Sequence, residues 1–230
     1  AAVQLIASQR IEQLFEEGIG MLTYFGHSSA NTLEYNLSDP QSYNNPSKYP
    51  FFFVSGCTAG NNFVYDTMRI VANRTTISEN FVLSKNRGSI AFMASTHYGI
   101  PPYLDEYNLK FFSLLGGQNY MAPVGNLIKN TIDQLGGGNP GLGYFNRADM
   151  EEMGLNGDPA LKIHSEPKPD FVVEDNLIKI DPSFISVSQE EFTVKAKTYN
   201  LGKAVGDSIY WDIKRTYPNG TVKTIFRKKI

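Results

Sequence analysis

The sequence has little of three features that narrow the function of a protein quickly: paired cysteines, excess charge of one sign and long apolar runs. Its single cysteine among 230 residues excludes an internal disulfide. The formal net charge is only −2, so the composition favours neither nucleic acid nor an anionic membrane as a partner. The longest apolar runs, such as residues 49–54, are too short to cross a bilayer, and no transmembrane segment is expected.

What the sequence does have is enough apolar material to build a core. Hydrophobic residues make up 41% and aromatic residues 13%, which suits one large domain, or one medium and one small domain. The first helical pattern starts at Ala1, without the charged start and apolar segment of a signal peptide. We therefore expect that an upstream part of the protein precedes this sequence.

The only cysteine follows directly after a short apolar run. Residues 49–54 are rich in Phe and Val, which is typical of a buried parallel strand, and a small-residue turn separates them from Cys57. Residues 20–25 form a similar strand before His27, and residues 28–49 are long enough for a crossover between parallel neighbours. Because ligands bind at the carboxyl ends of such strands, we expect a thiol and an imidazole side by side, as in a Cys–His nucleophile pair.

The first 166 residues alternate between strand and helix patterns, which favours a parallel sheet covered by helices on both faces. A third strong strand ends just before His97, and Pro101-Pro102 is expected to break the chain after it. The expected helices cover residues 3–17, 77–84 with Ser78 as N-cap, 105–115 and 122–135, and the third strand covers residues 88–95.

The pattern changes at residues 167–169. Beyond them, short apolar segments alternate with period two and are separated by turns, which predicts a small antiparallel β-sandwich. Residues 169–173, followed by residues 199–202, also look like the opening of an Ig-like adhesion-type module. The segment contains fewer strands than a full module, so we expect further sequence downstream.

Three blocks together resemble the gingipain-like branch of the caspase-fold cysteine peptidases. They are the apolar block ending at His27, the apolar block ending at Cys57 and the Gly-Asp-Pro segment within residues 155–161. The resemblance covers about residues 1–165. It implies an α/β fold, a caspase-type three-layer sandwich with a mainly parallel sheet, in which residues 1–166 form the C-terminal part of a peptidase domain. Residues 167–230 would then begin a partial Ig-like β-sandwich module.

The resemblance gives each candidate site residue a role. Cys57 would be the nucleophile and His27 its base, against simpler alternatives in which Cys57 is a buried structural thiol and His27 a turn residue. The backbone N–H groups of Ser28 and Cys57 would hold the oxyanion. His97 competes with His27 for the role of base, but the resemblance assigns it to the substrate cleft. The predicted substrate-binding residues are Ser95, Thr96, His97 and Tyr98.

Two features leave the site incomplete at this level. The family usually has Gly directly after the catalytic His, where this chain has Ser28, a disfavoured residue if that position needs a positive φ. The acidic partner of the His lies upstream in gingipain-like enzymes. Here Glu34 and Asp39 are local candidates without motif support, and Asp158 is expected to form a turn rather than bind a ligand.

No cofactor is predicted. Three His and one Cys have no zinc-ligand spacing, and the third of these histidines, His164, is expected to be structural. The resemblance alone allows a structural calcium ion.

The resemblance implies a cysteine endopeptidase with a polypeptide substrate. It further implies a secreted or cell-surface protein that processes or sorts secreted proteins in type IX secretion, with cell-surface or secretion-system partners. A catalytically impaired surface-binding relative of the same fold is the alternative, favoured by Ser28. A third class, an intracellular thiol hydrolase or transferase, shares the dyad but does not explain the Ig-like segment.

Overall fold

The computed structural model describes residues 2–35, 37, 39–63, 75–163, 166–186, 191–206 and 208–229. The chain divides into two compact units, Ala1–His164 and Ser165–Ile230, which are described separately below. Within the described part, no helix is long and apolar enough to span a membrane.

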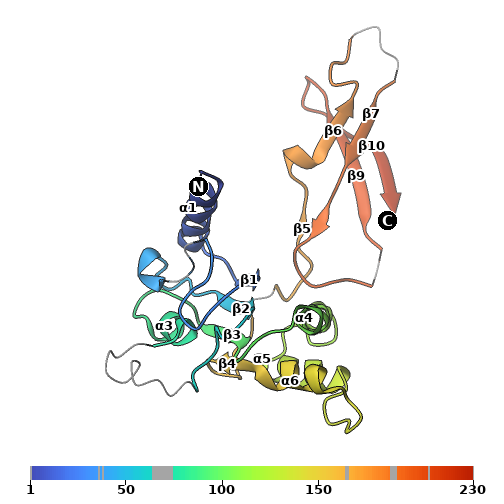
Figure 1. The fold of residues 1–230 in the computed structure, drawn as a ribbon. Helices are drawn as coiled ribbons and strands as arrows, with labels where there is room; N and C mark the ends of the chain where they lie inside the picture. The colour runs from blue at the N-terminus through green and yellow to red at the C-terminus, as the bar shows by residue number, and fades with distance from the viewer. Residues whose placement is uncertain are drawn as a thin grey trace. The chain divides into compact units, whose positions relative to one another are not determined.

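A four-stranded sheet forms the centre of the first unit (Figure 1). Its order along the sheet is β1 (Met21–Phe25), β2 (Phe51–Ser55), β3 (Ala91–Ser95) and β4 (Met153–Asn156). The first three strands are parallel, and β4 runs antiparallel to β3 at the edge. The predicted α/β fold with a mainly parallel sheet is therefore confirmed.

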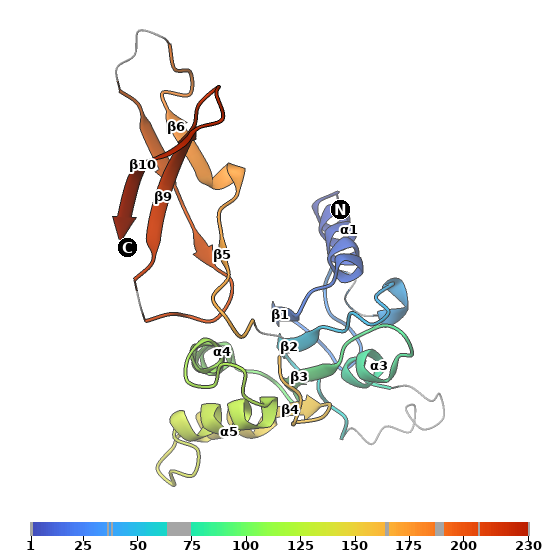
Figure 2. The ribbon, with the colours of Figure 1, turned by 180° about the vertical axis from the view of Figure 1, so that it is seen from behind.

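Both faces of this sheet are buried, which explains why its central strands are apolar runs rather than alternating ones. Successive side chains of a strand point to opposite faces, so Phe52 and Val54 enter one core and Phe51 and Phe53 enter the other. The first core is completed by α1 (Ala2–Glu17) and α3 (Ile77–Leu83). The second is completed by α4 (Pro101–Gly116), α5 (Val124–Gln134) and α6 (Tyr144–Glu152) (Figure 2).

Two helix starts differ from the sequence-based prediction. Helix α4 begins at Pro101, whereas Pro101-Pro102 was expected to break the chain. A proline at the first helical position has a preset φ and lacks an N–H that would be unpaired there in any case, so the pair starts the helix. Helix α3 is capped by Thr76 instead of Ser78, because the Thr76 side chain and Glu79 form a capping box.

The sequence patterns did not predict α6 and β4. Helix α6 carries only two buried residues, Asp149 and Met150, so it lacks a continuous apolar stripe. Strand β4 contains Gly154 and is antiparallel to its neighbour, which removes the apolar run typical of a central parallel strand. Both elements lie beyond β3, at the edge of the sheet that β4 forms.

In its described residues, the second unit contains three two-stranded antiparallel sheets. Its paired strands are β5 (Phe171–Val172) with β8 (Tyr199–Asn200), β6 (Ile178–Asp181) with β7 (Thr193–Ala196), and β9 (Tyr210–Thr216) with β10 (Val222–Lys229). A short 3-10 helix, η2 (Asp175–Leu177), precedes β6, and another, η1 (Pro40–Ser42), lies in the first unit. The Ig-like character of this segment stays a prediction.

Candidate active site

Three chemically active side chains follow three neighbouring strands at the same level. His27, Cys57 and His97 each lie two residues beyond the last residue of β1, β2 and β3. The strands are in register, with Phe25 opposite Ser55, and Val54 opposite Ala94. The fold therefore carries Cys57 between a histidine on each side, all at the carboxyl edge where parallel sheets place their ligands.

The loop around Cys57 is tied to the loop around His27. The Ser28 hydroxyl donates a hydrogen bond of 2.8 Å to the Cys57 carbonyl oxygen, and the Tyr24 hydroxyl donates one of 2.5 Å to the His27 carbonyl oxygen. The Cys57 Sγ atom, half-buried, lies 4.0 Å from the Gly99 carbonyl oxygen. Among the described residues no hydrogen bond joins the Cys57 thiol to either imidazole.

Gly56 allows these two loops to approach each other. A Cβ atom placed on Gly56 would lie 2.7 Å from the Gly26 carbonyl oxygen and even closer to the Ser28 hydroxyl oxygen. Real Cβ contacts of this kind do not occur without a shift of the backbone. The glycine before the cysteine is thus required by packing between two strand ends, whatever the chemistry of the site.

The strained backbone position of the site is Thr58, directly after the cysteine. Its φ is 57°, which is an outlier for a β-branched residue, whereas Ser28 is not among the residues with positive φ. The condition under which Ser28 would be disfavoured, a positive φ at this position, is therefore not met. Neighbouring contacts hold Thr58 in place, because its N–H donates to the His97 carbonyl oxygen at 2.7 Å. Within the described part of the chain, the N–H groups of Ser28 and Cys57 donate no hydrogen bond.

The predicted substrate-binding residues have different surroundings. Ser95 is 1% exposed, and its hydroxyl donates to the His97 carbonyl oxygen at 3.1 Å, so its side chain supports the turn from inside. Thr96 is half-buried. His97 and Tyr98 are exposed, and their rings meet edge to face at 4.7 Å.

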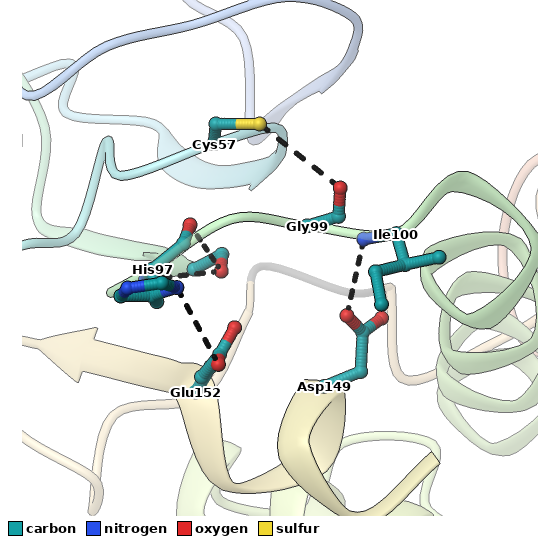
Figure 3. Close-up of polar contacts among 7 residues, drawn as sticks. Cys57, His97, Gly99, Ile100, Asp149 and Glu152 are labelled. Atoms are coloured by element: carbon teal, nitrogen blue, oxygen red, sulfur yellow. Dashed lines mark hydrogen bonds and ion pairs between the residues drawn. The ribbon is translucent and has the colours of Figure 1, made fainter. Parts of the chain in front are cut away.

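Two carboxylates on α6 contact the segment that follows β3 (Figure 3). Asp149 Oδ1 accepts a hydrogen bond of 3.2 Å from the Ile100 N–H, and Glu152 Oε1 lies 3.9 Å from His97 Nδ1. Burial raises the pKa of Asp149 to about 6, although the Ile100 N–H opposes this, and the nearby Glu152 adds to it. Burial also raises the pKa of Glu152, opposed by His97 and by the Ser95 hydroxyl.

The sequence analysis missed both carboxylates because it did not predict their helix. The one available signal was spacing. Phe145, Asp149 and Glu152 are four and three positions apart, which places them on one face of a helix. If that segment is assigned as a helix, Asp149 and Glu152 fall on the same helix face as Phe145.

The other acidic candidates have local structural roles. Asp39 caps η1, where its carboxylate accepts from the Gln41 N–H at 2.9 Å. Glu34 is exposed and lies near Tyr24. Burial raises the pKa of Tyr24, the Glu34 carboxylate adds to this, and a hydrogen bond to the Glu34 backbone opposes it. Asp158 accepts from the Ala160 N–H at 2.8 Å within its turn.

In the described ranges no three His, Cys, Asp or Glu side chains gather as metal ligands. A structural calcium ion stays a prediction from the resemblance. His164 lies outside the described residues.

Replacing Asp149 with asparagine is expected to raise the free energy of unfolding by about 2 kcal/mol at pH 8 and to change it little at pH 4. The folded-state pKa of about 6 lies above the ordinary Asp value, so between these pH values the folded protein binds more protons than the unfolded chain. The wild type therefore loses stability as pH rises through this window, whereas the neutral asparagine does not. Urea unfolding at both pH values measures the difference, and equal differences at pH 4 and pH 8 would contradict the prediction.

The first unit is similar to known proteins. The sequence model of the family described as peptidase family C25 matches residues 2–164. No curated protein matches the chain.

Among solved structures, a complex of Porphyromonas gingivalis RgpB pro- and mature domains is similar, with a TM-score of 0.53 and 15% identity over 73% of this chain and 40% of that chain. The Arg-specific cysteine proteinase gingipain R (RGPB) gives a TM-score of 0.52 and 17% identity over 73% and 39%. A structure described as a protease gives 0.55 and 11% over 95% and 56%. At these identities the likeness shows the fold alone, and the chain spans about two fifths to just over half of these structures.

Proposed function

Because the chain belongs to peptidase family C25, the gingipain family, we propose that it is a cysteine endopeptidase with Cys57 as nucleophile and His27 as general base. The observation that supports this proposal most strongly is that His27 and Cys57 each lie two residues beyond the ends of the paired strands β1 and β2. His27 is exposed and Cys57 is half-buried, so in this proposal a movement of their side chains brings the thiol and the imidazole into hydrogen-bond contact. Catalytic hydrogen bonds are often long in enzymes without substrate.

In the proposed reaction the His27 imidazole takes the proton of the Cys57 thiol, and the thiolate attacks the carbonyl carbon of the scissile peptide. The resulting oxyanion is bound by the N–H groups of Ser28 and Cys57. The carbon–nitrogen bond then breaks, and the leaving amine receives the proton from His27. Water, deprotonated by His27, attacks the thioester and releases the carboxylate product, and the thiol is restored. Two free backbone donors next to the thiol support this assignment of the oxyanion site.

The proposal is tested by alkylation with peptide chloromethyl ketones, because the protein has one thiol and every label reports on Cys57. We expect peptide probes to label Cys57 at least about 100-fold faster than iodoacetamide does, after correction for the reactivity of each reagent with free cysteine. Cys57→Ser removes all labelling and serves as the control. Peptide probes that react no faster than with free cysteine would contradict a peptidase site.

A second candidate function is a catalytically impaired surface-binding relative of the same fold. Two observations favour it: the Cys57 thiol makes no hydrogen bond to His27 within the described residues, and Ser28 stands where the family has glycine. Under this alternative the peptide probes bind without rapid alkylation. An inert peptide would then still protect Cys57 from iodoacetamide in a saturable manner, and this protection would report peptide binding.

We further propose that the protein is secreted or held at the cell surface, where it processes or sorts secreted proteins in type IX secretion. The gingipain resemblance and the series of antiparallel strands in the second unit support this role. A sorting reaction requires a peptide amine to replace water at the thioester. A ligated product in the presence of such an amine would support sorting, and hydrolysis alone would argue against it.

A further inference from the structure

The loop at residues 96–100 connects the candidate nucleophile to α6. On the Cys57 side, the Gly99 carbonyl oxygen lies 4.0 Å from the thiol, and the His97 carbonyl oxygen accepts the Thr58 N–H at 2.7 Å. The loop thus contacts both the thiol and the strained residue after it. Figure 3 shows the Gly99 carbonyl group directed at the thiol.

On the other side, one face of α6 contacts the segment from His97 to Tyr103 at three points. Phe145 stacks on the Tyr103 ring with centroids 6.3 Å apart, Asp149 accepts the Ile100 N–H at 3.2 Å, and Glu152 lies 3.9 Å from the His97 imidazole. The backbone adds a fourth contact, because the Thr96 N–H donates to the Glu152 carbonyl oxygen at 2.8 Å.

We propose that Asp149 is a positioning residue that holds the loop at residues 96–100 against Cys57 through the Ile100 N–H, with Glu152 assisting through His97. The inference rests on the proposed role of Cys57 as nucleophile. It adds a regulatory element to that site, since the state of a buried carboxylate on α6 then controls access to a thiol carried by β2.

The burial of Asp149 supports this role. The residue is 3% exposed, and its Oδ2 atom has no hydrogen-bond partner among the described residues. A buried carboxylate with one oxygen lacking a hydrogen bond lowers the free energy of unfolding, and an apolar side chain would fill the same space with a smaller loss of stability. What the carboxylate provides here is a charge-assisted acceptor for the Ile100 N–H, at the first residue before α4.

The charged and titratable groups around Asp149 come from three directions. Helix α4 contributes Tyr103, Glu106 and Tyr107, which line a small cavity together with Asp149. Helix α6 itself contributes Glu152, and His97 of the loop pairs with Glu152. Among the described residues none of these facing groups is a Lys or Arg, so the carboxylate is neutralised by a proton rather than by an ion pair. Because burial raises the pKa of Asp149 to about 6, opening that exposes the carboxyl to water is coupled to loss of a proton, so the loop is expected to be better protected at pH 5 than at pH 7.

The proposal is tested by hydrogen exchange in the peptides covering residues 57–62 and 96–104. We expect Asp149→Ala to raise amide exchange at least tenfold in both peptides, because the loop and Thr58 are released together. Asp149→Asn keeps an acceptor oxygen and should change exchange less than threefold at pH 7. The matched control is Glu151→Gln, which removes one charge from the exposed face of the same helix and should leave both peptides unchanged.

Alkylation by iodoacetamide links the loop to the thiol. Asp149→Ala is expected to accelerate alkylation of Cys57 about threefold, and Glu152→Ala to produce a smaller increase in the same direction. If Asp149→Ala folds and its exchange and alkylation rates equal those of the wild type, the proposal is overturned. If this variant does not fold, protection of residues 96–104 between pH 5 and pH 7 decides. The proposal requires protection to rise on acidification in the wild type and not in Asp149→Asn, and identical profiles would overturn it.

The outcome stays separable from the proposed function. If Cys57 is not a peptidase nucleophile, peptide probes fail on the wild type while the exchange and iodoacetamide patterns persist. If the loop is not held by Asp149, peptide probes succeed on the wild type while the Asp149 variants exchange normally.

Discussion

Replacing His27 with alanine is expected to lower the rate of peptide cleavage about 10²- to 10⁴-fold at neutral pH, the usual contribution of a general base. The thiolate is the nucleophilic form of a cysteine, and the imidazole is the group proposed to take its proton. Alkylation by iodoacetamide should therefore slow as well, and should recover as pH rises past about 8.5, the ordinary pKa of a free thiol. Cleavage assays and alkylation rates between pH 6 and pH 10 check both parts.

The matched control is His97→Ala, because His97 occupies the equivalent position after the strand on the other side of Cys57. We expect alkylation to change less than tenfold and the preference among peptide probes to shift, since His97 is an exposed residue of the adjoining loop. The opposite result, a large loss with His97→Ala and none with His27→Ala, would make His97 the base, with Glu152 as the carboxylate that orients it.

Gly56→Ala is expected to reduce cleavage by about 100-fold or more, since a displacement of about 1 Å at a nucleophile has effects of that size. The new methyl group would lie 2.7 Å from the Gly26 carbonyl oxygen, so one of the two strand ends must move. Overpacking of this kind also lowers the free energy of unfolding by about 1–3 kcal/mol. Steady-state kinetics and urea unfolding measure the two effects.

Gly116→Ala is the control for this substitution. Gly116 lies in α4, and an added Cβ there meets nothing within 4 Å, so alanine should leave cleavage unchanged and stabilise the helix slightly. Adding Ser28→Ala to Gly56→Ala should restore only part of the loss, because the Gly26 carbonyl oxygen remains in the way. Wild-type cleavage and stability in Gly56→Ala would show that the two loops are not packed as described.

The sequence by itself determined the sheet and the family. The apolar runs of β2 and β3 are local patterns typical of strands buried on both faces, and the structure confirms both strands. The blocks ending at His27 and Cys57 keep their order and spacing within a single chain, and the match to peptidase family C25 confirms the family they indicated. The dyad, the substrate-binding residues and the Ig-like module stay predictions.

The tertiary structure alone decided what surrounds the thiol. Asp149 and Ile100 are 49 positions apart, and Ser28 and Cys57 are 29 positions apart, so no local pattern relates them. The need for glycine at position 56 comes from the carbonyl group of another strand end, and the strain falls on Thr58 rather than on Ser28. Local periodicity specifies which face of an element is buried, but contacts between distant segments depend on how those elements pack.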